Sequence, residues 1–165
     1  MVSTIGILGL CTSLAFPVYA ADLVKQETHH HEYSISGFIS HGELQKTLQQ
    51  LEKTSNGVVQ VEVVGQSHKG LDIYTAKVGT GDKVILLQSE IHGNEKTGTV
   101  ALLNLLKSLS TNSKEAKKIR EEVTIVFMPM MNPDASEADK RRNSMTWDEA
   151  VRDFPQLASA KPSWN

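Results

Sequence analysis

The sequence contains a single cysteine, few aromatic residues and almost no net charge. Because Cys11 has no partner in the chain, an intrachain disulfide and a cysteine-rich zinc site are both excluded. Any metal ion would have to be bound by histidine and carboxylate side chains. The 17 basic residues are balanced by 19 acidic ones, and no basic cluster is longer than residues 140–142, so a nucleic acid is not expected as a partner.

Long apolar runs are also scarce, and the one run without a charge covers residues 4–18. It ends in Val18-Tyr19-Ala20, a small-x-small pattern typical of a signal-peptide cleavage site. A transmembrane helix needs about 20 apolar residues, and this run is shorter and contains Pro17, so no stable membrane anchor is expected. We predict a signal peptide over residues 1–20 and a secreted or periplasmic mature protein. A hydrophobic first helix of a cytoplasmic protein is the alternative.

The composition is that of one globular domain, with 22% charged and 39% hydrophobic residues. Residues 21–39 are polar, include the tract from His29 to His31, and are expected to form a flexible lead-in. The domain is predicted to begin at Ser40, which forms a capping box with Glu43 and starts an amphipathic helix that ends near residue 56.

The patterns beyond this helix predict a sheet and buried helices. Residues 59–63 and 71–78 alternate between apolar and polar side chains, which predicts an antiparallel pair of strands. Residues 84–87 form a continuous apolar run, as expected for a central strand covered on both faces. The helix over about residues 95–109 is apolar nearly all round and is expected to be deeply buried. The predicted fold class is α/β, with a mixed central β-sheet flanked by helices.

The remaining segments predict one more strand and two short helices. Asn112 and Glu115 are expected to cap a charged helix, and residues 123–130 to form a second buried strand. Asn132-Pro133-Asp134 then predicts a turn. A second capping box, over residues 146–149, predicts the last helix.

Two side chains that can bind metal lie where the apolar strand meets the buried helix. His92 and Glu95 are three positions apart, so at the start of a helix they face the same way. An imidazole nitrogen and a carboxylate oxygen each bind zinc at about 2.0–2.2 Å, so a pair that shares one ion lies roughly 3.0–3.6 Å apart. Gly93 would let the backbone turn sharply, and Asn94 could cap the helix. A solvated His-x-x-Glu surface pair is the alternative.

Four features, in this order, resemble the M14 zinc carboxypeptidases. They are the hairpin over residues 66–79, the strand ending in Ile91-His92-Gly93-Asn94-Glu95, the strand ending in Met131-Asn132-Pro133-Asp134, and Arg141-Arg142-Asn143 beyond it. The resemblance covers about residues 40–165, and it identifies them as a partial catalytic domain, the amino-terminal half. One departure is Ala135, where the family more often has glycine.

The resemblance implies a zinc-carboxypeptidase-like fold with Zn²⁺ as the cofactor and His92 and Glu95 as the first two zinc ligands. Arg141 would polarise the scissile carbonyl and stabilise its oxyanion, with Arg142 as an alternative and a solvated basic patch as another. The third zinc ligand, the general base and the carboxylate-binding residues would lie beyond Asn165. The chain alone, as a fragment, is therefore expected to be inactive.

The implied function is a secreted or periplasmic metallocarboxypeptidase that hydrolyses C-terminal residues of a peptide substrate or trims a cell-wall peptide. An N-acyl amino-acid deacylase of the succinylglutamate desuccinylase or aspartoacylase type has a similar His-Gly-Asn-Glu turn and is an alternative. A non-catalytic binding module on the same scaffold is another. The sequence predicts neither the residue preference nor the oligomeric state.

Overall fold

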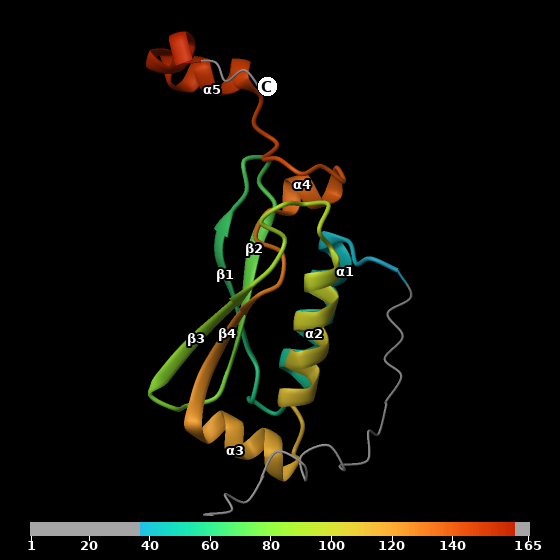
Figure 1. The fold of residues 1–165 in the computed structure, drawn as a ribbon. Coiled ribbons are helices and arrows are strands. Elements are labelled where there is room, and N and C mark those ends of the chain that lie inside the picture. The colour runs from blue at the N-terminus through green and yellow to red at the C-terminus, as the bar shows by residue number, and fades with distance from the viewer. Residues whose placement is uncertain (1–36, 161–165) are drawn as a thin grey trace, which may run out of the picture. The chain divides into compact units, whose positions relative to one another are not determined.

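A four-stranded sheet forms the centre of the computed structural model, which describes residues 37–160 (Figure 1). The strands are β1 Gln60–Gln66, β2 Asp72–Val78, β3 Lys83–Gln88 and β4 Val123–Met128, in the spatial order β1-β2-β4-β3. β1 with β2 and β2 with β4 are antiparallel, whereas β3 and β4 are parallel. The predicted mixed sheet and its antiparallel first pair are therefore confirmed.

The helices lie on one face and at the ends of this sheet (Figure 1). Figure 1 shows α1 and α2 side by side on one face of the sheet and α3 at the end where β4 begins. None of the helices within residues 37–160 has the length and apolar character needed to cross a bilayer. The helices are α1 His41–Thr54, α2 Thr97–Leu109, α3 Lys114–Glu122, α4 Pro133–Glu137, α5 Trp147–Asp153 and the 3-10 helix η2 Pro155–Ala160.

Helix α1 begins and ends as its sequence predicts. The Ser40 hydroxyl accepts a hydrogen bond from the Glu43 backbone N–H, and the Glu43 carboxylate accepts one from the Ser40 backbone N–H at 2.8 Å. Asn56 and Gly57 follow the helix with φ angles of 53° and 84°, in the left-handed region that ends helices. Ile39, at the end of the predicted lead-in, is buried in the core. Residues 21–36 of that lead-in and the predicted signal peptide lie outside the described residues.

The hydrophobic core lies between one face of the sheet and the helices α1 and α2. Phe127 of β4 is fully buried and stands opposite Ala76 of β2. Helix α2 buries only one stripe, because Leu105 is 41% exposed while Leu103 and Leu106 are fully buried. The expectation of a helix buried nearly all round was wrong. The leucines of the two helices that meet in this core are Leu44, Leu48, Leu103, Leu106 and Leu109.

Within residues 37–160, strand β3 lies at the edge of the sheet rather than at its predicted central position. Among these residues it pairs only with β4, and Val84 and Leu86 are 68% and 53% exposed. Their side chains alternate with Ile85 and Leu87, which share the face of Ile125 and Phe127 in β4. In the described part of the chain only Leu87 of this run packs against the core, because Ile85 is 41% exposed although it shares the face of Leu87.

Several predicted ends shift by one to three residues. Helix α2 begins at Thr97, and its N-cap residue, Lys96, makes no side-chain cap, so Asn94 does not cap this helix. Ser113 rather than Asn112 caps α3, because its hydroxyl accepts the Ala116 N–H. At α3 two adjacent polar residues could cap, and the path of the backbone decides that Ser113 does, whereas α2 begins without a side-chain cap.

The Asn-Pro-Asp segment opens a short helix instead of forming only a turn. Asn132 accepts the Ala135 N–H at 3.4 Å, and Pro133 occupies the first position of α4. Gly93 is needed for close approach to this helix: a Cβ there would lie 2.0 Å from the Ala135 carbonyl carbon and 2.2 Å from the Ser136 nitrogen. The segment that carries His92 is thereby held against α4.

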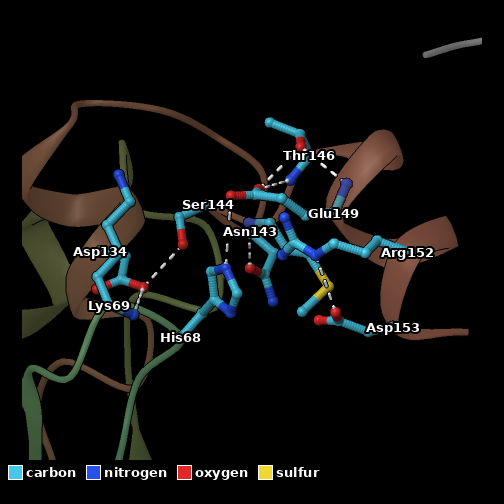
Figure 2. Close-up of polar contacts among 10 residues, drawn as sticks. His68, Lys69, Asp134, Asn143, Ser144, Thr146, Glu149, Arg152 and Asp153 are labelled. Atoms are coloured by element: carbon cyan, nitrogen blue, oxygen red, sulfur yellow. Dashed lines mark hydrogen bonds and ion pairs between the residues drawn. The ribbon is translucent and has the colours of Figure 1, made fainter.

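A buried carboxylate joins the β1–β2 turn to α4 and to the chain beyond it. Asp134 is 4% exposed. It accepts a hydrogen bond from the Ser67 hydroxyl at 2.6 Å. Figure 2 shows two more, from the Lys69 backbone N–H at 3.0 Å and from the Ser144 hydroxyl at 2.7 Å. Burial alone would raise the pKa of Asp134, but these hydrogen bonds outweigh it and hold the pKa below its ordinary value.

The one-sided core predicts different costs for two leucine truncations. Leu106→Ala removes a fully buried side chain and should lower the free energy of unfolding by about 2–5 kcal/mol. Leu86→Ala is the matched control on the exposed strand edge and should change it by less than about 0.5 kcal/mol. Urea denaturation followed by circular dichroism measures both values. Equal losses in the two variants would contradict this description of the core.

The depressed pKa of Asp134 predicts a pH-dependent contribution to stability. That contribution is fully present above the ordinary pKa of 3.8 and is lost as the pH falls through the lower folded-state pKa. Asp134→Asn should therefore be less stable than the wild type at pH 7, and the difference in unfolding free energy should shrink as the pH approaches 2. Urea titrations at several pH values measure it. A difference that stays constant over this range would show that the charge of Asp134 is not what stabilises the fold.

Candidate metal centre

The candidate site lies where β3 and β4 leave the sheet at the same edge. Two backbone hydrogen bonds continue the contact past the strand ends, from the Ser89 N–H to the Met128 oxygen and from the Met131 N–H to the Ser89 oxygen, both at 3.1 Å. The next residues turn sharply, since the Glu95 N–H donates to the His92 oxygen at 3.1 Å. This edge is where α/β sheets place functional side chains.

The turn brings the two predicted metal-binding side chains together. His92 Nδ1 lies 3.0 Å from Glu95 Oε2, within the separation expected for two ligands of one ion. Their side chains are 36% and 55% exposed, so both are open to solvent. The distance between the two side chains therefore agrees with the predicted separation.

Arg141 reaches the same carboxylate from the far end of the described chain. Its Nη1 donates to Glu95 Oε1 at 2.7 Å, so the two oxygens of Glu95 face different partners, His92 and Arg141. The hydrogen bonds from His92 and then Arg141 hold the pKa of Glu95 below its ordinary value. Glu95 is thus ionised at neutral pH, in the state that binds a cation.

Neighbouring side chains hold this turn in place. The Asn132 amide donates to the Ile91 carbonyl oxygen at 3.2 Å, next to His92. The Lys96 ammonium lies 3.4 Å from Asp139 Oδ1, just before the arginine segment. Together with the contact at Gly93, these interactions fix the turn to α4 and the residues after it.

A buried glutamate beside the site escaped the sequence analysis. Glu90 is 2% exposed, has a φ of 54°, and its carboxylate accepts hydrogen bonds from Thr99 in α2 and Ser136 in α4. Burial raises the pKa of Glu90 above its ordinary value. The only sequence signal was an acidic residue between the apolar strand and Ile91. Asp134 was identified in its motif, but its partners Ser67 and Ser144 carried no local signal.

The site opens into a pocket of about 640 Å³. His92, Arg141 and Arg142 line it together with apolar side chains that include Met145 and Trp147. None of its ten lining residues is acidic. The pocket is therefore lined by the candidate metal ligand His92, by two arginines and by apolar side chains.

The pair fits a zinc ion in donor type and separation but supplies only two ligands. Within residues 37–160, no group of three histidine, cysteine, aspartate or glutamate side chains is placed to hold one ion. Catalytic zinc sites use three protein ligands and one open position. His92 and Glu95 would therefore form part of such a site.

The sequence matches a known family and longer relatives. A family model described as zinc carboxypeptidase matches residues 44–153. Carboxypeptidase SOL1 of Arabidopsis thaliana is 27% identical over 130 residues, which cover 72% of this chain and 26% of that protein. Probable carboxypeptidase 2 of Trichophyton verrucosum is 42% identical over 50 residues, 30% of this chain and 10% of the relative. The matched part of the chain thus spans about a quarter or less of these relatives.

Solved structures share the fold. Carboxypeptidase A from Helicoverpa armigera matches with a TM-score of 0.60 and 23% identity, covering 78% of this chain and 34% of its own. Bovine thrombin-activatable fibrinolysis inhibitor, solved with tick carboxypeptidase inhibitor, gives a TM-score of 0.62 and 18% identity over 68% of this chain and 39% of its own. The expected zinc-carboxypeptidase-like fold is confirmed. Because the family model also matches more than half of the sequence, this chain belongs to the M14 zinc carboxypeptidases.

Proposed function

We propose that this chain contributes part of the active site of a zinc-dependent metallocarboxypeptidase that removes C-terminal residues from peptides. One observation carries the proposal: His92 Nδ1 and Glu95 Oε2 lie 3.0 Å apart, and Arg141 reaches the other oxygen of the same carboxylate. In a member of this family, a nitrogen and an oxygen ligand with an adjacent guanidinium fit carbonyl hydrolysis.

Each of these residues has a task that its geometry supports. Zinc bound by His92 and Glu95 would supply a Lewis acid that polarises a peptide carbonyl. Glu95 is held ionised by its hydrogen bonds and keeps Oε2 toward His92. Arg141 donates a hydrogen bond to Glu95 through Nη1. A guanidinium has five N–H donors, so the remaining N–H groups of Arg141 can donate to a carbonyl oxygen that gains negative charge.

The 165-residue chain by itself is proposed to hold zinc weakly and to hydrolyse no peptide. Two protein ligands leave the ion incompletely coordinated, and the described residues place no third ligand beside them. The resemblance implies a third ligand and a general base in addition to His92 and Glu95.

The carboxypeptidase function is favoured over the deacylase alternative. Both named relatives are carboxypeptidases, and the matching family model covers the segment that carries the candidate site. The remaining alternative, a binding module without metal, makes the opposite prediction for zinc. Zinc binding therefore distinguishes the carboxypeptidase from the binding module.

Zinc binding should depend on the proposed pair. We expect His92→Ala and Glu95→Gln each to weaken zinc binding by at least about tenfold, since each removes one of two ligands. Equilibrium dialysis measures the zinc affinity. The parent chain for these variants has His29, His30 and His31 replaced by alanine, so that this histidine tract does not bind zinc.

His68→Ala is the matched control, because His68 lies in the β1–β2 turn and does not contact Glu95. Its zinc affinity should equal that of the parent chain. Undiminished binding in both the His92 and Glu95 variants would contradict the proposed site, and turnover by the 165-residue chain would contradict the proposal that it is incomplete.

Export is proposed on the pattern of the first 20 residues. Cleavage after Ala20 follows from the small-x-small pattern, and it would leave a mature chain without cysteine. N-terminal sequencing of protein from the culture medium or periplasm should begin at Ala21. Mature protein that still begins with Met1 in the cytoplasm would contradict the signal peptide.

A further inference from the structure

We propose that Glu90 is a positioning residue for the metal site, because its hydrogen bond to Thr99 closes the segment between them, residues 91–98. This segment, the metal loop, carries both candidate zinc ligands, His92 and Glu95. The inference rests on the proposed zinc-dependent function and deepens it. In the described part of the chain, Glu90 does not join the two ligands in a group that could hold one ion. Its role would be to keep them at the separation that one ion requires.

Two adjacent contacts form the base of the metal loop. The Thr99 hydroxyl donates to Glu90 Oε1, although nine positions separate the two residues in the sequence. One position earlier at each end, a Cβ on Gly98 would lie 2.0 Å from the Ser89 hydroxyl oxygen. Glycine at this position therefore lets the two ends of the loop approach each other closely. The base of the loop is fixed by one hydrogen bond and one close backbone contact.

Glu90 also reaches α4, at the place where the metal loop itself lies against that helix. The Ser136 hydroxyl is a second hydrogen-bond partner of the Glu90 carboxylate. The backbone of the same serine lies close to Gly93, where a Cβ would be 2.2 Å from the Ser136 nitrogen. Glu90 and Gly93 are on either side of His92 in the sequence. The histidine is therefore held from both sides against α4.

The hydrogen bond that closes the loop lies in the interior of the protein. Glu90 is 2% exposed and Thr99 is fully buried. The Thr99 hydroxyl also contacts the carbonyl oxygen of Pro129 at 2.5 Å, directly after β4. A buried hydrogen bond is protected from competition with water, and a buried group that loses its partner is destabilising. One hydroxyl thus connects the Glu90 carboxylate to the ends of both strands that lead to the site.

The backbone conformation indicates that the Glu90 side chain is retained for its contacts. Its φ of 54° lies in the left-handed region, which glycine adopts without strain and other residues adopt at a cost. Burial of a carboxylate is also unfavourable unless hydrogen bonds compensate it. Backbone strain of this kind is concentrated at functional sites. Two unfavourable features therefore coincide at the residue whose side chain closes the metal loop.

Closure of the loop should matter for zinc because both ligands come from the same short segment. A loop that opens at its base samples more conformations, and only some of them keep His92 Nδ1 and Glu95 Oε2 at 3.0 Å. Removing a group that orients metal ligands typically weakens metal binding about 10- to 100-fold. Glu90 acts through the backbone rather than by contact with a ligand, so we expect an effect at the lower end of this range.

The test measures zinc affinity by competition with a chelator, on the protein at the full length that its gene encodes. Glu90→Ala removes the closing hydrogen bond and should weaken zinc binding by about tenfold. Alanine is as unfavourable as glutamate at this φ, so the variant does not relieve backbone strain. Glu90→Gln keeps the length of the side chain and its hydrogen-bonding groups, and it should bind zinc within about threefold of the wild type.

Leu106→Ala is the matched control for general destabilisation. Leu106 is a fully buried core residue of the same helix, α2, and makes no hydrogen bond at the base of the loop. Its zinc affinity should stay within about twofold of the wild type at a temperature where every variant is folded. Equal weakening in Leu106→Ala and Glu90→Ala would show that Glu90 only stabilises the fold, and would overturn the positioning role.

Thr99→Val tests whether the closing hydrogen bond is the route of the effect. Valine has nearly the same shape as threonine and lacks the hydroxyl, so zinc binding should again weaken by about tenfold. Zinc affinity that is unchanged in Thr99→Val, or in Glu90→Ala, would contradict the proposal. Zinc binding by the wild type would in either case leave the proposed function standing.

A metal-free measurement separates this inference from the proposed function. The Met131 N–H donates to the Ser89 oxygen at 3.1 Å, so its hydrogen exchange reports on the base of the loop. In Glu90→Ala this exchange should accelerate at least about tenfold relative to that of Leu44 in α1. If the wild type binds no zinc but this acceleration is found, the loop closure stands and the proposed function fails. If the wild type binds zinc and Glu90→Ala changes neither exchange nor affinity, the positioning role is wrong.

Discussion

The parallel pairing of β3 with β4 is the constraint on which the candidate site depends. Because both strands leave the sheet at one edge, the segments after Gln88 and Met128 continue side by side. The close approach at Gly93 then holds the first segment against α4. Glu95 and Arg141 meet there although 46 positions separate them in the sequence.

Two carboxylates have different tasks around this edge. Glu95 is open to solvent and divides its oxygens between an imidazole and a guanidinium, an arrangement suited to a cation and a charged transition state. Asp134 is buried and accepts three hydrogen bonds that join the β1–β2 turn, α4 and the segment before Met145. The first group is therefore exposed at the candidate site, and the second holds three segments of the chain together.

The sequence predicts local features of this fold well and long-range ones poorly. The capping box at Ser40 and the turn geometry of His92 with Glu95 depend on residues three positions apart, and both are found. The apolar run of β3 indicates a strand but does not specify its neighbours, so its exposed edge could not be foreseen. Ser67 and Asp134 are 67 positions apart, and nothing in either local pattern marks their hydrogen bond.

The central claim is that His92 and Glu95 share one zinc ion. Zinc K-edge X-ray absorption on the chain without its histidine tract, loaded with less than one equivalent of zinc, tests it directly. The account predicts imidazole nitrogen and carboxylate oxygen scattering at about 2.0–2.2 Å, with the imidazole contribution lost in His92→Ala and the spectrum altered in Glu95→Gln. Spectra that are identical for the parent chain and both variants would contradict it.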